Sequence, residues 1–419
     1  GAALLELITY LETWESGQEP CLEENILDDM EVASPEETLR NASLSLLGRP
    51  PSAEEFATLQ NDESHLPALL DSLMNQEPFP ERVAEMYNDS LLTDFYTNFD
   101  PPSGTDNFTH RSIDKGRDAL RRVLESFNAT DHRFPEWDFL ENIAECKNLS
   151  AEFEDTDAFC DKAKTYTNNA IAREPLKIIE YVVRENKPFS EILTADYTLV
   201  NAYSAVAMGY FDGQVELLDG DFINPLNPDE YHPARLSGHN EIPFRPHAGI
   251  LTTTTYLQRR PTNSGNRNRH RARLFYQDFL DLDIFDFTEA PAEGELGDNP
   301  TYQNQICASC HRVLDPVAGA HQNWNSLSYY NPNGTWYDEL NEESANYMVA
   351  TGFEGEIIPE EDRSRGLAWL ANRISNEARF GHAVVGKILQ GLTGIAPLKM
   401  PKDISTPNYE TLYRAYENQ

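Results

Sequence analysis

The segment NQICASCHRVLDP, residues 304–316, constrains this chain most, because it holds two of only five cysteines and His311 follows them directly. Cys307 and Cys310 form a C-x-x-C pair, a pattern found in zinc sites, in redox-active dithiols and at c-type haem attachment points. A structural zinc site needs further ligands, and no second C-x-x-C or H-x-x-x-H follows Cys310. A redox dithiol normally opens a helix after a strand, whereas a polar connector precedes this pair.

Covalent haem is therefore the favoured interpretation, and a C-x-x-C pair without haem remains the alternative. One helical turn lets the thiols of Cys307 and Cys310 reach the two vinyl groups of a haem, and His311 then projects its imidazole toward the iron. Asp315 and Pro316 are predicted to end this helix. We expect a backbone carbonyl in that turn, beside Pro316, to accept the imidazole N–H.

Several segments of the chain resemble one family, the planctomycete-type cytochrome-c-like secreted proteins. The segment CASCHRVLDPVAGAHQNWNSLSYYNPNGTW resembles their haem module, with D-P after C-x-S-C-H and a later G-x-W, although VAGAHQNW departs from the family pattern. The other matching segments are LSLLGRPPSAEEFATL, ENKPFSEILTADYTLVNAY, HAGILTTTTYLQRRPTN and NEARFGHAVVGKILQGLTG. The resemblance implies a secreted, largely helical protein with one c-type haem and an unassigned biochemical role.

Composition limits the possible partners and the compartment. Seventy acidic against 33 basic residues give a net charge of -37, which argues against binding to nucleic acid or anionic membranes. No apolar run is long enough to span a membrane. The acidic, lysine-poor composition and the secreted family together predict a periplasmic or extracellular protein.

Local signals predict a mainly α fold. Ser34 with Glu37 and Ser52 with Glu55 are S-x-x-E capping boxes, and the G-R-P-P stretch between them predicts two short helices packed as a hairpin. A further helix is predicted to start at Pro175, because the apolar residues after it share one helix face: Leu176, Ile179, Val182 and Val183.

The run GILTTTTYL, residues 249–257, is the best strand candidate because it is rich in β-branched residues, with a threonine-rich helix or loop as the alternative. At 419 residues the chain is long enough for more than one domain. We predict an N-terminal extension (1–30), a multi-helix scaffold (31–240), a connecting segment with an arginine cluster (241–299) and a cytochrome c-like haem domain (300–419).

The other cysteines predict a disulfide. Cys146 and Cys160 flank an acidic loop, and a bond between them would contribute about 3 kcal/mol. Cys21 is then left over, to remain free or to pair with another chain, unless it bonds one of these two.

The ligand opposite His311 decides what a haem does here, because a closed sixth position favours electron transfer and an open one permits oxygen or peroxide chemistry. Met348 is the favoured metal ligand, at a spacing typical of small cytochromes. The competing residues are Met208, Met400, His247, His321 and His382.

An arginine cluster stands out in so acidic a chain: Arg259, Arg260, Arg267, Arg269, Arg271 and Arg273. One interpretation is that Arg267 and Arg271 bind the haem propionates or form a docking patch. The other is a solvated helix face bridged to carboxylates such as Asp278 and Asp281. The segment DGDFINPLNPDE, from Asp219, spaces oxygen ligands as calcium sites do, so calcium is a second candidate cofactor.

Together these features predict a monohaem c-type cytochrome that transfers single electrons outside the cytoplasm, alone or within a larger extracellular assembly. The expected partner is a redox protein, and self-assembly remains open. The alternative is a haem enzyme of the peroxidase or oxygenase type. A dihaem peroxidase would need a second C-x-x-C-H, which this sequence lacks, and it contains no G-x-S-x-G. A surface protein with a sensory or relic haem is a third interpretation.

Overall fold

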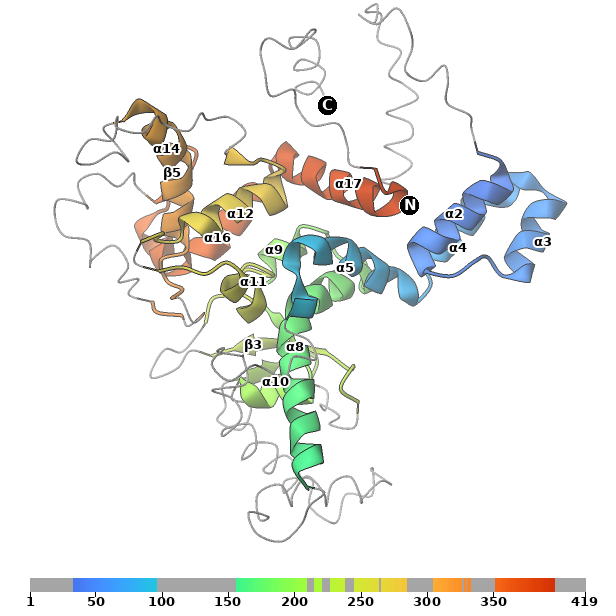
Figure 1. The fold of residues 1–419 in the computed structure, drawn as a ribbon, viewed down its shortest axis with the longest axis horizontal. Helices are drawn as coiled ribbons and strands as arrows, with labels where there is room; N and C mark the ends of the chain where they lie inside the picture. Colours follow the sequence, from blue (N-terminus) through green and yellow to red (C-terminus); the bar gives the residue numbers. More distant parts are fainter. Residues whose placement is uncertain are drawn as a thin grey trace, which may run out of the picture. The chain divides into compact units, whose positions relative to one another are not determined.

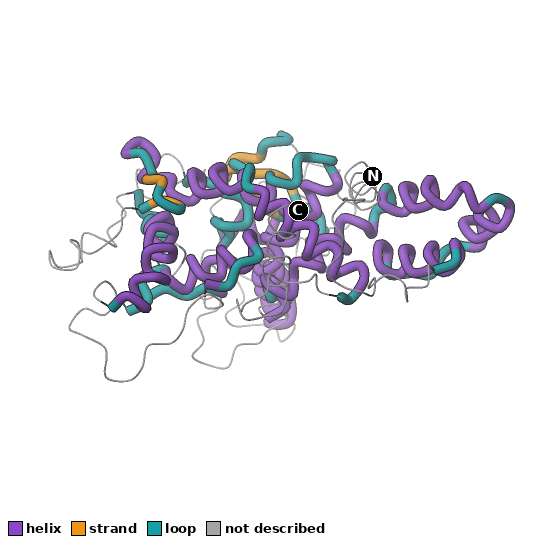
Figure 2. The backbone as a smooth tube through the Cα atoms, turned by 90° about the horizontal axis from the view of Figure 1, so that it is seen from above, coloured by secondary structure: helices purple, strands orange, loops and turns teal. Residues whose placement is uncertain are grey.

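A computed structural model describes residues 33–95, 156–208, 215–220, 227–237, 245–263, 265–284, 304–325, 328, 330–332 and 351–395 (Figure 1). Within these ranges the protein has twelve α-helices and five short strands, which confirms the predicted mainly helical class. Figure 2 shows how little of the described backbone is strand. None of the described helices is long and apolar enough to cross a bilayer. The predicted 1–30 extension lies outside the described residues.

The chain divides into two compact units. The first comprises Gly1–Met86 and Val384–Gln419, and the second comprises Tyr87–Ala383. The unit boundaries fall inside two helices, α5 (Pro78–Leu91) and α17 (Ala378–Thr393).

In the first unit, α2 (Pro35–Leu47) packs on α3 (Ala53–Asn61), as the capping signals predict, and more extensively on α4 (Leu66–Met74). The short 3-10 helix η1 (Glu63–His65) connects α3 to α4. Ser52 and Glu55 form a complete capping box, and the Ser34 hydroxyl accepts the Glu37 N–H at 3.1 Å. The core of this unit is a cluster of leucines: Leu39, Leu46, Leu47, Leu59 and Leu73.

The second unit is built on the long helix α8 (Thr156–Arg184), which corrects the prediction of a helix beginning at Pro175. Residues 156–160 of the predicted acidic loop also belong to this helix. Proline removes one backbone hydrogen bond, but Ile171 before it and Leu176 after it are both buried, so packing continues through Pro175. Two further helices pack on α8, namely α10 (Ala202–Ala207) and α11 (Thr254–Arg259).

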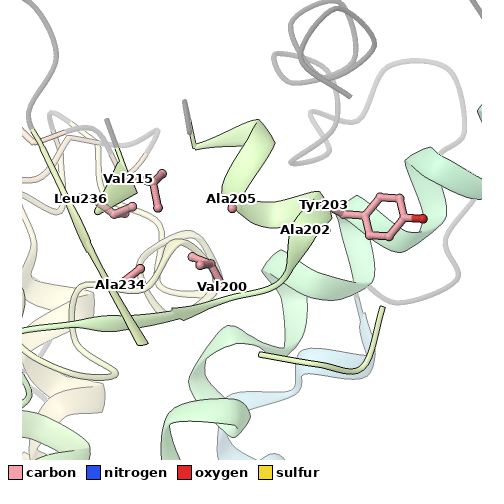
Figure 3. Packing of buried hydrophobic residues seen from close by; sticks show 7 residues of the cluster. All are labelled: Val200, Ala202, Tyr203, Ala205, Val215, Ala234 and Leu236. Carbon is pink, nitrogen blue, oxygen red and sulfur yellow. The ribbon is translucent and has the colours of Figure 1, made fainter. Parts of the chain in front are cut away.

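A small antiparallel sheet also belongs to this unit. Its strands are β1 (Thr198–Val200), β3 (His232–Leu236) and β2 (Val215–Leu217), in the spatial order β1-β3-β2. Val215 pairs with Leu236, and Thr198 pairs with Ala234. Figure 3 shows the apolar cluster that this sheet forms with α10, from which the Tyr203 ring points away toward α8; its members are Val200, Ala202, Tyr203, Ala205, Val215, Ala234 and Leu236.

The threonine-rich run is not a strand; it forms turns that lead into α11, so the strand prediction is wrong and the helix-or-loop alternative is confirmed. Thr253 caps α11 by accepting the Tyr256 N–H. Gly249 has a φ of +45° and donates its N–H to the Ala195 carbonyl at 3.0 Å. A Cβ at this position would lie 2.1 Å from the carbonyl oxygen of Ile192, at the short helix α9 (Glu191–Thr194), so only glycine fits.

The C-x-x-C-H segment opens helix α14 (Gln305–Ala320), which packs on α12 (Arg269–Leu280) and on the strand β4 (Gly352–Phe353). β4 pairs with β5 (Glu356–Ile357). A 3-10 helix, η5 (Glu360–Arg365), then leads into α16 (Gly366–Ile374), which also packs on α14. These elements hold the motif-bearing helix from several directions.

Candidate functional site

Cys307, Cys310 and His311 lie in the first two turns of α14. Spacings of three and four residues along a helix bring both thiols and the imidazole to one face. Neither cysteine is in a disulfide, and both are partly exposed. The His311 side chain is 22% exposed. The three side chains therefore remain accessible for covalent attachment and metal ligation.

A buried carboxylate orients His311. Nδ1 of His311 lies 3.1 Å from Oδ1 of Asp315, one helical turn further on, and the Asp315 side chain is 0% exposed. An ionised carboxylate can only accept, so Nδ1 is the donor, and Nε2 is the nitrogen that this arrangement directs to a metal. The prediction of a backbone carbonyl as the partner is corrected: the partner is a carboxylate.

Arg269 faces the same carboxylate from the first residue of α12. Its Nε lies 2.7 Å from Oδ1 of Asp315, and its Nη2 lies 3.1 Å from Oδ2. This two-point geometry is the strong form of an arginine–carboxylate pair. It offsets the cost of burying the Asp315 charge, so His311, Asp315 and Arg269 form one connected polar group.

The expected helix end at Asp315 and Pro316 is wrong, because α14 continues to Ala320 with Pro316 inside it. Residues 314–320 are all buried, and this packing stabilises the helix although proline removes one hydrogen bond. The contribution of Pro316 to a haem site stays a prediction.

Arg271, predicted to bind a propionate, is completely buried and donates five hydrogen bonds to protein oxygens. Its acceptors are the carbonyls of Arg260, Leu257, Trp324 and Asn325 and the side-chain oxygen of Asn268. A propionate at this residue would have to displace one of these oxygens. Arg267 is half-buried, in a turn with a φ of +45°, and its propionate role stays a prediction.

The arginine cluster is only partly a solvated surface: Arg260 and Arg271 are buried, and the other four arginines are partly exposed. Arg260 is 2% exposed and forms an ion pair with Asp278. The interpretation of the cluster as arginines bridged to carboxylates predicted a pairing with Asp278. Arg273 pairs with Asp283, its Nη2 lying 2.7 Å from Oδ2. The burial of Arg260 and Arg271 is a tertiary effect that charge spacing alone does not reveal.

The candidates for the opposite ligand lie in different environments. Met348 and Met400 fall outside the described residues. Met208 packs on the apolar cluster of Figure 3, and His382 is exposed. His247 accepts the Leu236 N–H through Nε2 at 3.0 Å, and burial lowers its pKa to about 3.

His321 is completely buried just after α14. Its Nδ1 lies 3.0 Å from the Val317 carbonyl oxygen, and its Nε2 has no hydrogen-bond partner among the described residues. Burial, with a further contribution from the charge of Arg271, lowers its pKa to about 3. The ring is therefore neutral in the folded protein at neutral pH.

Asp219 opens the calcium-like segment, which is only partly described, and its Oδ2 lies 2.8 Å from Nδ1 of His232. Among the described residues, no group of three or more His, Cys, Asp or Glu side chains is arranged to hold a metal ion. Calcium stays a prediction. Cys21 and Cys146 and the side chain of Cys160 lie outside what the structure describes, so the disulfide also stays a prediction.

The donor set on α14 fits a c-type haem: two accessible thiols at helical spacing and an imidazole whose second nitrogen contacts a carboxylate. The sequence contained a signal for Asp315 as the partner of His311: the two residues are four positions apart, which places both on one face of a helix. The contact between Arg269 and Asp315 could not be predicted in this way, because the two residues are 46 positions apart in the sequence.

Residues 111–209 match the family model PSD4, described as a protein of unknown function (DUF1592). This segment includes ENKPFSEILTADYTLVNAY and ends before α14 begins. No curated protein matches the chain, and no solved structure matches it either. This match over part of the chain agrees with an unassigned role and leaves the haem module as a prediction.

Proposed function

We propose that this protein is a monohaem c-type cytochrome that carries single electrons outside the cytoplasm. Cys307 and Cys310 would hold the haem, and His311 would ligate its iron through Nε2. The observation that carries this proposal is that α14 presents two partly exposed thiols and the partly exposed imidazole of His311 at helical spacing. When bound, the haem supplies a centre that accepts and releases one electron.

The chain's own residues provide attachment and orientation. Each thiol would be joined to one vinyl group of the haem as a thioether, with the thiol hydrogen ending on the neighbouring vinyl carbon, so the attachment would require no oxidant. Asp315 holds the Nδ1 proton and with it the ring tautomer of His311. The packing of α12, α16 and β4 on α14 fixes the helix that carries these groups.

Met348 remains the proposed opposite ligand. It precedes Gly352 by four residues, and β4, which begins at Gly352, packs on α14. Four residues of chain span at most about 14 Å, and this short connection to β4 supports the proposal. A methionine opposite His311 would favour reversible electron transfer over ligand exchange.

The net charge of -37 favours a redox partner with a basic docking surface. Opposite charges accelerate encounter at low ionic strength, and salt screens this attraction. The rate of electron exchange with a basic partner should therefore fall as salt is added.

A haem enzyme is the second candidate, and the carboxylate beside His311 favours it specifically. A carboxylate acceptor makes the imidazole a stronger electron donor to iron, which supports chemistry at an open position. Cyanide separates the two candidates, because it binds an open position rapidly and a methionine-ligated iron slowly.

Mass spectrometry of the mature protein, produced with a c-type maturation system, tests the proposal. We expect one covalent haem in the wild type, none in the Cys307→Ser/Cys310→Ser double variant and one in the Ser309→Ala control. The visible spectrum of Met348→Ala should lose its low-spin character. A wild-type polypeptide without haem mass would reject the proposed function.

A further inference from the structure

The carboxylate of Asp315 lies between two hydrogen-bond donors, the imidazole of His311 and the guanidinium of Arg269. On one side it accepts from Nδ1 of His311 at 3.1 Å, and on the other it accepts from Nε and Nη2 of Arg269 at 2.7 and 3.1 Å. The Asp315 side chain is fully buried, whereas those of His311 and Arg269 are both 22% exposed. Charge effects on the imidazole are therefore weakly screened by solvent.

The physical consequence concerns electron density on the imidazole. A carboxylate that accepts the Nδ1 proton makes Nε2 a stronger donor, which favours oxidised iron over reduced iron. A guanidinium bound to the same carboxylate withdraws part of its charge and weakens this effect. Asp315 and Arg269 should therefore shift the reduction potential of an iron on His311 in opposite directions.

We infer that Asp315 and Arg269 are a pair of positioning residues that set the reduction potential of the centre at His311, with Asp315 lowering it and Arg269 raising it. This inference rests on the proposed haem ligation by His311.

The protein contains a matched control pair. Arg273, on the same helix as Arg269, binds Asp283 with the same two-point geometry, at 3.1 and 2.7 Å. Asp283 accepts from Arg273 and from Nε2 of Gln277, whereas His311 contacts Asp315. Substitutions in this pair remove the same kinds of charge, on α12 and just after it, without changing Asp315, which accepts from His311.

The experiment is a spectroelectrochemical titration of the haem-loaded protein at pH 8, far above the ordinary carboxyl range. We expect Asp315→Asn to raise the midpoint potential and Arg269→Gln to lower it. Each change should alter the equilibrium constant for one-electron reduction by about tenfold, which corresponds to about 59 mV. Asp283→Asn and Arg273→Gln should stay near wild type.

Circular dichroism checks that each variant is folded. Arg269→Lys keeps the charge and loses the two-point contact, so it should shift the potential in the direction of Arg269→Gln by a smaller factor. It provides the test if Arg269→Gln does not fold.

The outcomes are distinguishable. Absence of covalent haem in the wild type overturns both the proposed function and this inference. Haem-loaded variants at Asp315 and at Arg269 that shift in the same direction, or by no more than the control pair, overturn the inference alone. A general loosening of His311 would produce such same-direction shifts, whereas opposite shifts support the charge mechanism.

Discussion

Nη1 of Arg271 lies 2.8 Å from the carbonyl oxygen of Trp324, and both residues are buried. The guanidinium of Arg271 thereby ties α12 to the irregular segment that follows α14. Its other hydrogen bonds go to the carbonyls of Arg260, Leu257 and Asn325 and to the side chain of Asn268. One side chain thus joins three parts of the second unit.

Arg271→Lys should destabilise the fold by about 3 kcal/mol, because lysine has three donors in place of five and leaves buried carbonyl oxygens without partners. Urea unfolding followed by circular dichroism measures this loss. Arg273→Lys, in a partly exposed ion pair on the same helix, is the control and should cost less than about 1 kcal/mol. Equal losses in the two variants would contradict the joining role of Arg271.

Glu174→Gln should change how stability depends on pH. Burial raises the pKa of Glu174, although the Thr198 hydroxyl, Arg245 and the Thr254 N–H oppose the shift. The folded state therefore binds the proton more tightly than the unfolded state, whose pKa is about 4.3, and wild-type stability falls as pH rises above that value. Urea midpoints between pH 5 and 8 should show this fall in the wild type and a flatter profile in Glu174→Gln. Parallel profiles would contradict the prediction.

The folded state of the His321→Asn variant should lose less stability than the wild type when the pH is lowered from 7 to 5. Since burial lowers the His321 pKa to about 3, the unfolded chain, with a pKa near 6.5, binds the proton first as pH falls. Stability is lost from pH 6.5 downward, by roughly 2 kcal/mol at pH 5. The difference in unfolding free energy between pH 7 and pH 5 measures the effect. His382→Asn, at an exposed position, is the matched control, and an undiminished loss in His321→Asn would refute the assignment.

Gly249→Ala should cost about 3 kcal/mol or more, because its Cβ would lie 2.1 Å from the Ile192 carbonyl oxygen and the backbone has a positive φ. Thermal unfolding measures the loss. Gly381→Ala is the opposite case: this helical glycine has nothing within 4 Å of an added Cβ, so alanine should stabilise α17 by about 1 kcal/mol. A small effect at Gly249 would contradict the close approach to Ile192.

The parts of the fold that depend on neighbours in the sequence were predictable. The capping box of Ser52 and Glu55 is present because its donors and acceptors are three residues apart, so tertiary structure is not needed to form it. The helical class follows from the same kind of signal. The pairing of β2 with β3 had no comparable signal, because both strands are short and far apart in sequence.

Pro175 and Pro316 both lie inside helices, although each was predicted to mark a helix boundary. Pro175 and Pro316 each remove a backbone donor, which suggested a helix start and a helix end. In both helices the neighbouring turns are buried, and this packing outweighs the local cost. Burial depends on the whole fold, so the local pattern placed these boundaries incorrectly.

The candidate site was predictable in part. The motif itself placed Cys307, Cys310 and His311 together, and helical spacing alone would have indicated Asp315. The approach of Arg269 depends on the packing of α12 against α14, for which the sequence offers no local sign. The burial of Arg271 also depends on tertiary packing and has no local sign in the sequence.

The segment after α14 is held by Arg271, which donates a hydrogen bond to the Trp324 carbonyl from a position 53 residues earlier in the sequence. Transplanting residues 304–325 into another scaffold would therefore move the C-x-x-C-H motif without two arginines of α12. Arg271 would no longer bind the segment after α14, and Arg269 would no longer bind Asp315. The smallest portable module that keeps this chemistry intact includes α12 as well as α14.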